Sequence, residues 1–172
     1  MDLKDKIRTV PNFPKEGVMF GDITTLLQDA DALEYTIKLM LEKVKGVKVD
    51  VVVATESRGF IFGAIIAYAL KAGFVPLRKP GKLPWKTRRK EFDTEYSKDC
   101  FEIHEDAVKK GDKCLIVDDI IATGGSARAA CELVEELGGE IVGVLSLITL
   151  TFLGGEEKLR KYKQYTIIRE EK

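Results

Sequence analysis

Apolar residues recur along the chain at two spacings, and these spacings predict alternating helices and strands. Asp31–Lys45 carries apolar residues at helical spacing, so that Leu33, Ile37 and Met40 would share one buried face. Val47–Thr55 is a run rich in β-branched residues, which is typical of a buried strand. The other expected helices are Gly59–Ala72, Ala127–Leu137 and Gly155–Tyr162, and the other expected strands are Phe74–Leu77, Lys113–Val117, Glu140–Leu150 and Tyr165–Ile168.

This alternation predicts an α/β fold with a central, mainly parallel sheet flanked by helices. Ligands of such sheets bind beyond the carboxyl ends of the strands. Two segments lack the periodicity: residues 1–30, which contain PNFPKEGVMFGDIT, and Arg78–Phe92, which is basic and interrupted by proline and glycine. We expect both to be loops with functional potential within a single domain that covers residues 1–172.

Composition excludes several classes of protein. The chain has 28 basic and 28 acidic residues, and this neutral balance argues against a dedicated binder of nucleic acid or acidic membranes. No apolar run reaches the length of a membrane span, and the N-terminal MDLKDKIRTV has charges where a signal peptide needs an apolar core. Cys100, Cys114 and Cys131 have neither paired nor metal-like spacing, which indicates reduced thiols and a cytoplasmic protein. His104 is the only histidine, so a histidine-based triad is not expected.

The segment Leu115–Ser126, LIVDDIIATGGS, carries the strongest chemical signal. Asp118 and Asp119 follow an apolar strand, and the Gly124-Gly125 pair then lets the backbone turn into a helix. The turn and the helix N-terminus offer N–H groups to an anion, while two carboxylates suit a group with several hydroxyls, a divalent metal, or both. A Gly-Gly turn alone is a weak signal, because it is often only a turn. The ordered set is stronger, and it lacks the lysine of a P-loop and the GxGxxG of a dinucleotide fold.

This segment resembles the phosphoribosyl pyrophosphate motif of the type I phosphoribosyltransferases. The resemblance implies that Asp118 and Asp119 are catalytic residues that hold the ribose 2- and 3-hydroxyls. It further implies a Mg²⁺ cofactor that the substrate holds, with no direct metal ligand on the protein. The ribose 5-phosphate would be bound by Ala122, Thr123, Gly124, Gly125 and Ser126.

Further segments resemble the adenine phosphoribosyltransferase family within this group. They are Phe13–Phe20 with Asp22-Ile23-Thr24, Thr55–Gly63 (TESRGFIFG), Arg78–Pro84 (RKPGKLP) and Glu95-Tyr96. Their order and spacing match over nearly the whole chain. The resemblance implies transfer of the 5-phosphoribosyl group from phosphoribosyl pyrophosphate to adenine, which gives AMP and pyrophosphate in purine salvage. It also implies that residues 1–30 form a small hood over the base, that residues 78–97 form a lid loop with the strand that follows, and that the chain is a homodimer.

The adenine site implied by the resemblance draws on the hood and on two other segments. Phe20 would stack on the purine ring and Ile120 would cover its opposite face. The backbone of Met19 would hydrogen-bond the edge that bears the amine. Arg58 would lie near the base, although an arginine that caps a strand–helix turn is nearly as good an interpretation.

The basic segment and the glutamate after it complete the expected site. Residues 78–90 hold seven basic residues and no acid, which suits either a solvated loop or a mobile lid that neutralises pyrophosphate. The family motif favours the lid for Arg78, Lys79 and Lys82, and a basic residue near Arg78 would reach across a dimer interface. Glu95 would exchange a proton with the imidazole ring of the base, its alternative being an exposed strand residue.

Two departures from the family pattern and three competing functions stay open. Gly21 stands where relatives often carry arginine, and Ser97 where glycine often follows Glu-Tyr. A transferase for another base would need a donor opposite the 6-oxo group, which the main-chain contact of the hood suits less well. A ligand-sensing regulator would be expected to carry a DNA-binding segment, and none is visible. A nucleic-acid binder would use 78–90 in a salt-dependent way.

Overall fold

The computed structural model describes residues 1–171 and divides the chain into two compact units, Met1–Leu39 and Met40–Lys172. The first unit holds a 3₁₀ helix η1 (Leu3–Lys6), strands β1 (Arg8–Pro11) and β2 (Met19–Asp22), helix α1 (Thr24–Gln28) and most of helix α2 (Ala30–Lys43). β1 and β2 form an antiparallel hairpin. The expectation of loop structure throughout residues 1–30 is therefore wrong for these elements.

Local polar contacts hold the hairpin of the first unit together. The link between its strands places Asn12 at φ 57° and Gly17 at φ 85°, and the Asn12 side chain accepts a hydrogen bond of 2.9 Å from the Gly17 N–H. At the end of β2, the Asp22 carboxylate accepts hydrogen bonds from the Thr24 hydroxyl and N–H and pairs with Arg8, which together lower the pKa of Asp22 to about 2. Such side-chain-to-backbone contacts leave no periodic pattern of apolar residues in the sequence. The hydrophobic pattern therefore does not predict this hairpin.

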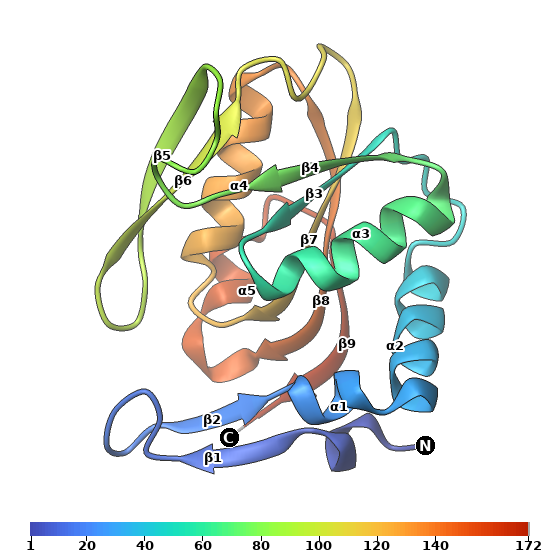
Figure 1. The fold of residues 1–172 in the computed structure, drawn as a ribbon, viewed down its shortest axis with the longest axis vertical. Coiled ribbons are helices and arrows are strands. Elements are labelled where there is room, and N and C mark those ends of the chain that lie inside the picture. Colours follow the sequence, from blue (N-terminus) through green and yellow to red (C-terminus); the bar gives the residue numbers. More distant parts are fainter. Residues whose placement is uncertain (172) are drawn as a thin grey trace. The chain divides into compact units, whose positions relative to one another are not determined.

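The second unit is built on a five-stranded parallel sheet with the order β4-β3-β7-β8-β9 (Figure 1). The strands are β3 (Val51–Thr55), β4 (Gly73–Leu77), β7 (Lys113–Ile121), β8 (Glu140–Leu150) and β9 (Gln164–Glu170). The helices are α3 (Arg58–Leu70), α4 (Gly125–Glu136) and the short α5 (Gly155–Lys158), with a 3₁₀ turn η2 (Thr151–Leu153) after β8. The predicted class, a parallel sheet flanked by helices, is confirmed.

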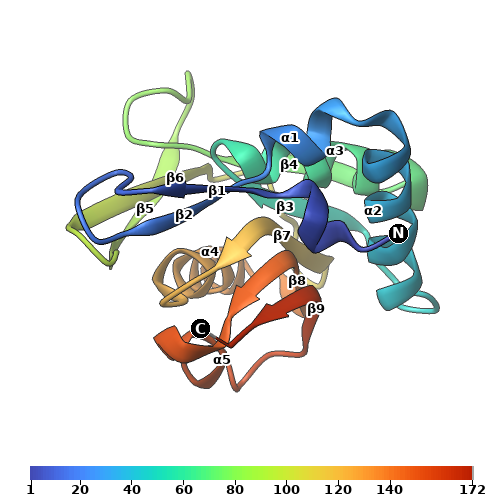
Figure 2. The same ribbon diagram turned by 90° about the horizontal axis from the view of Figure 1, so that it is seen from below.

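The chain leaves the middle of the sheet in two directions. From β3 it passes through α3 to β4, and from β7 it passes through α4 to β8 on the other side. Because such crossovers are right-handed, the two helices cover opposite faces, as Figure 2 shows. The alternation of side chains agrees: Val53 and Ile116 pack in the core on the α4 face, whereas Gly63 of α3 lies against Ala54.

A second antiparallel hairpin corrects the prediction for the basic segment. Residues 78–86 are irregular apart from a bridge between Arg78 and Glu102, but β5 (Thr87–Asp93) pairs with β6 (Lys98–His104) over its whole length. The expectation of a loop over Arg78–Phe92 is wrong for its second half. From Arg89 to Asp93, β5 alternates between exposed and half-buried positions, and its inner side chains include Phe92, whose ring lies 4.7 Å from that of Phe101. Because its outer face carries charged residues, this alternation is not evident in the sequence.

The remaining expected boundaries need smaller corrections. β8 has the predicted bounds, Glu140–Leu150. The helix expected over Gly155–Tyr162 is only Gly155–Lys158, and β7 runs four residues beyond the expected end at Val117. Asp118 and Asp119 therefore lie inside a strand and not in the turn after it. No helix in residues 1–171 combines the length and the apolar character that crossing a membrane requires.

Candidate functional site

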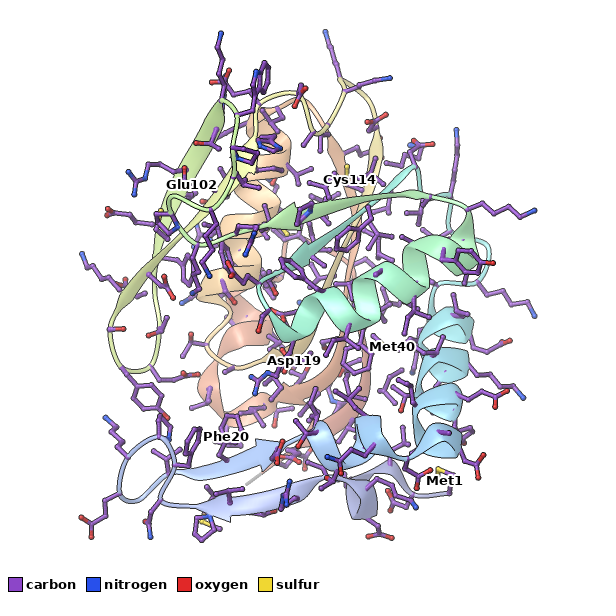
Figure 3. All side chains as sticks on the ribbon, viewed as in Figure 1. Met1, Phe20, Met40, Glu102, Cys114 and Asp119 are labelled. Carbon is purple, nitrogen blue, oxygen red and sulfur yellow. The ribbon has the colours of Figure 1, made fainter. Side chains whose placement is uncertain are left out.

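The switch point of the sheet lies between β3 and β7, where the two crossovers depart in opposite directions. In open α/β sheets, ligands bind at the carboxyl ends of the strands at such a point. Here those ends carry Glu56, Ser57 and Arg58 after β3, and Asp118 with Asp119 in β7. Figure 3 shows Asp119 beside the first turn of α3. The topology thus brings together residues that are about sixty positions apart in the sequence.

The two aspartates form a buried acidic pair. Asp118 is 7% exposed and Asp119 is 5% exposed. Oδ1 of Asp118 accepts a hydrogen bond of 2.8 Å from the Asp119 N–H, and the Thr55 hydroxyl also contacts this carboxyl. Burial first, and the neighbouring Asp119 carboxylate second, raise the pKa of Asp118 well above its ordinary value. Two full negative charges are therefore costly here unless a cationic or hydrogen-bonding partner arrives.

Asp119 has an ion-pair partner and still lacks a hydrogen-bond donor. The Arg58 Nε lies 2.7 Å from Oδ2 of Asp119, but this oxygen receives no well-directed hydrogen bond from the described residues. Gly59 makes the close approach of α3 possible, because a Cβ there would lie 2.8 Å from the Thr55 hydroxyl and 3.2 Å from Asp118 Oδ1. A buried carboxylate oxygen without a donor is what a ribose hydroxyl would satisfy.

The turn after β7 leads directly into a bare helix N-terminus. Gly124 precedes α4 with φ 83°, a conformation that L side chains rarely adopt, and no side chain caps the helix. The first N–H groups of α4 are thus left to an external acceptor. Thr123 and Ser126 are partly exposed beside this turn and offer hydroxyl donors. The binding of an anion by residues 122–126 stays a prediction, and the left-handed Gly124 and the uncapped start of α4 are compatible with it.

Two neighbours of this loop were not found from the sequence. A Cβ on Gly125 would collide with the carbonyl oxygen of Asp93 at the end of β5, and a Cβ on Gly155 would collide with the carbonyl oxygen of Ala122. Gly124 also lies against the backbone of Gly155. The Gly154-Gly155 pair after β8 is a sequence signal that could have indicated this contact, whereas nothing in the sequence marks Asp93.

The three basic residues assigned to the lid converge on one carboxylate, Glu56, which the pattern analysis did not single out. Glu56 Oε2 accepts a hydrogen bond of 2.6 Å from the Lys79 N–H, and Oε1 contacts the Arg78 guanidinium at 3.3 Å and the Lys82 ammonium. Burial works to raise the pKa of Glu56, but these three donors outweigh it and lower this pKa to about 2. The Lys79 ammonium itself pairs with Asp99. Arg78 Nε is buried and has no hydrogen-bond partner among residues 1–171.

The other expected site residues come from β7, from the turn between β5 and β6, and from β2. Ile120 is a half-buried residue of β7. Glu95 is exposed in the tight turn between β5 and β6, two residues after the Asp93 carbonyl that contacts the loop at Gly125. Met19 and Phe20 belong to β2 of the first unit, where Met19 is 66% exposed and the Phe20 ring lies 5.0 Å from that of Phe13.

The cysteines and a hollow along α4 and α5 lie away from this chemistry. All three cysteines are free and buried, and burial raises the pKa of the Cys114 thiol to about 12. A hollow of about 770 Å³ runs along α4 and α5, but its charged residues are mostly paired with each other, as in the contacts of Lys90 with Glu136 and of Lys161 with Glu135. No group of three potential metal-ligating side chains occurs among residues 1–171.

Comparison with known proteins gives consistent matches. The model of the phosphoribosyl transferase domain matches residues 22–172. Adenine phosphoribosyltransferase from Acetivibrio thermocellus is 54% identical over 169 residues, 98% of this chain and 99% of the relative, and the enzyme from Clostridium novyi is 52% identical over 98% of both chains.

Solved structures agree with these sequence matches. The crystal structure of adenine phosphoribosyltransferase from Thermoanaerobacter pseudethanolicus has a TM-score of 0.95 at 48% identity and covers 98% of both chains. That of the Giardia lamblia enzyme complexed with 9-deazaadenine has a TM-score of 0.93 at 36% identity, and covers 100% of this chain and 99% of the other.

Proposed function

We infer the reaction of this chain from its family. The chain belongs to the phosphoribosyl transferase family and, within it, to the adenine phosphoribosyltransferases. The enzyme transfers the 5-phosphoribosyl group of phosphoribosyl pyrophosphate to adenine, and it produces AMP and pyrophosphate. The observation that carries the assignment of the site is the buried Asp118–Asp119 pair at the switch point, directly before the uncapped N-terminus of α4.

The ribose 5-phosphate would occupy this pair and the loop after it. Oδ2 of Asp119 would accept a hydrogen bond from a ribose hydroxyl, and Asp118 would hold the neighbouring hydroxyl. The phosphate would take the N–H groups of the turn and of the first residues of α4, with the hydroxyls of Thr123 and Ser126. The negative charge of the pair would also favour the positive charge that develops at C1 of the ribose.

Pyrophosphate would be held by Arg78, Lys79 and Lys82. The buried Arg78 Nε, which has no hydrogen-bond partner, supports this role, because a phosphate oxygen could satisfy it. We also propose that Mg²⁺ binds with the substrate. The two carboxylates, one of which has an oxygen that accepts no hydrogen bond, suit a hard cation. They are too few to hold it without the oxygens of the substrate. When bound, Mg²⁺ would neutralise charge on the pyrophosphate.

The proposed contacts to the base follow from the family membership. Phe20 would stack on the purine, the Met19 backbone would hydrogen-bond the amine edge, and Ile120 would contact the ring. Arg58 is better supported as the ion-pair partner of Asp119, with its contact to the base a secondary proposal. The exposed Glu95 would reach the imidazole ring through closure of the segment that carries it.

These roles give a balanced chemical step. The bond from C1 to the pyrophosphate oxygen breaks, and its electron pair leaves with the pyrophosphate. A ring nitrogen of adenine forms the new bond at C1 from the opposite face, and the imidazole proton passes to Glu95. The protein aligns both substrates and excludes water, so no covalent intermediate with the chain is needed. A single functional domain, a homodimer, a cytoplasmic location and the absence of nucleic-acid binding stay predictions.

One assay tests the proposed function. The purified protein with phosphoribosyl pyrophosphate and Mg²⁺ is given adenine, guanine, hypoxanthine or xanthine, and the nucleotide products are separated. AMP should form far faster than the other nucleotides. Equal rates with an oxopurine would contradict the choice of base, and tight binding of phosphoribosyl pyrophosphate without turnover would point to a regulator that has lost catalysis.

A further inference from the structure

Glu56 stands where an anionic ligand of the basic residues would be expected to stand. Its side chain is only 10% exposed, yet it is charged and in contact with three donors. Its backbone N–H donates to the Leu77 carbonyl at 3.0 Å, so the end of β3 is tied to the end of β4 independently of the carboxylate. The fold therefore does not need the negative charge to join these two strands.

The two cations around Glu56 differ in how firmly they are held. Arg78 is fixed through its backbone, which exchanges hydrogen bonds of 3.0 and 2.7 Å with Glu102. Lys82 follows Gly81 in the irregular stretch, and its side chain is 48% exposed. An arriving anion could therefore take Lys82 from Glu56 by rotation of one exposed side chain, while Arg78 stays in place.

We propose that Glu56 is an internal stand-in for pyrophosphate: in the free enzyme it is the counterion of Arg78 and Lys82, and it yields Lys82 when pyrophosphate binds. This inference rests on the proposed function for the role of the two cations. Glu56 is a positioning residue, because it acts through Arg78 and Lys82. It keeps two like charges together before substrate arrives, and its competition lowers the affinity for pyrophosphate so that the product can leave.

Removal of the Glu56 charge makes the net charge of the cluster more positive. With Glu56 ionised, the cluster of Glu56, Arg78 and Lys82 carries one net positive charge, and a neutral residue at position 56 would leave two. A carboxylate that serves only to hold the segment in shape would weaken pyrophosphate binding when removed. A carboxylate that competes with pyrophosphate would strengthen it.

The test is the affinity of the purified protein for magnesium pyrophosphate alone, measured by titration calorimetry, in Glu56→Gln. Glutamine keeps an oxygen for the Lys79 N–H and loses the charge. We expect the dissociation constant to fall roughly three- to tenfold, and the product inhibition constant of pyrophosphate to fall with it, with a slower release step. Glu56→Asp, which keeps the charge, should stay close to the unmodified protein.

The matched control is Glu140→Gln, which removes one carboxylate from the Lys113–Glu140 pair at the amino end of β8 and should leave pyrophosphate binding unchanged. Unchanged or weaker binding in folded Glu56→Gln would overturn the proposal. If neither Glu56→Gln nor Glu56→Ala folded, the carboxylate would be structural, which would overturn it equally. Because the titration needs no adenine, a protein that binds pyrophosphate more tightly as Glu56→Gln but makes no AMP would contradict the proposed function alone.

Discussion

Two carboxylates at the carboxyl ends of neighbouring strands, one buried and one partly buried, stand in opposite electrostatic surroundings. Asp118, in β7, lies beside a second acid, and its pKa is raised well above the ordinary value. Glu56, just after β3, lies beside two cations and a backbone N–H, and its pKa is lowered to about 2. The neighbouring ends of two strands thus carry an excess of negative charge and an excess of positive charge.

This difference matches the charge pattern of the proposed substrate. The bond that breaks in phosphoribosyl pyrophosphate separates a ribose that becomes positive from a pyrophosphate that leaves as an anion. An acidic pair on one side and a basic cluster on the other would stabilise both ends of that separation. The switch point of the sheet is what makes such a division possible, because it brings two independent loops to one place.

The largest expected effect comes from the acidic side. Asp119→Asn keeps the size of the side chain and removes the charge that faces C1, so we expect kcat/KM to fall roughly 100- to 1,000-fold. The melting temperature should change by only a few degrees, since the asparagine side chain keeps an oxygen that can face the partly exposed Arg58 guanidinium. Steady-state assays and thermal unfolding of the same preparation would separate the two effects. An unchanged rate would remove Asp119 from the mechanism.

Glu95, the proposed acceptor of the proton of the base, provides the next effect. Glu95→Gln should lower the rate of the chemical step by about 100-fold and leave the binding of phosphoribosyl pyrophosphate unchanged. Single-turnover measurements by rapid quench give the first quantity, and equilibrium titration gives the second. Equal single-turnover rates would show that this exposed residue of the β5–β6 turn has no part in catalysis.

The sequence predicts the local structure around the acidic pair more completely than the contacts of the basic residues. Asp118, Asp119 and 122–126 lie within one short segment, and its strand, turn and helix are predicted by the hydrophobic period and the glycines. Glu56 acquires its role from partners more than twenty residues away, and Gly125 from the backbone of Asp93. No local pattern encodes such contacts. The hairpins β1–β2 and β5–β6 were missed for a related reason: turn contacts and a charged outer face hide their period.

A smaller effect is expected from the contact between Gly125 and the end of β5. Gly125→Ala would place a Cβ against the Asp93 carbonyl and push the phosphate loop away from the end of β5. We expect the KM for phosphoribosyl pyrophosphate to rise about tenfold and the free energy of unfolding to fall by about 1–3 kcal/mol. Gly73→Ala is the matched control, because a Cβ there meets its nearest atom at an ordinary 3.8 Å. If both variants behaved alike, the contact between β5 and the loop would have no functional weight.

The smallest effect is on stability and follows from the raised pKa of Asp118. At a pH below the unfolded-state pKa, Asp118 is protonated in both states, and its raised pKa does not lower the free energy of unfolding. As the pH rises toward its folded-state pKa, the folded protein keeps a proton that the unfolded chain releases, so the contribution of Asp118 to stability is progressively lost. Asp118→Asn should therefore raise the melting temperature by a few degrees at about pH 8 and by less at about pH 5, even as activity falls. Thermal unfolding across this range, with the exposed Asp106→Asn as the control, would show the difference growing with pH if burial beside Asp119 governs this residue. A difference that shrank with pH would mean that Asp118 is held as a stabilised anion, and the contrast with Glu56 would disappear.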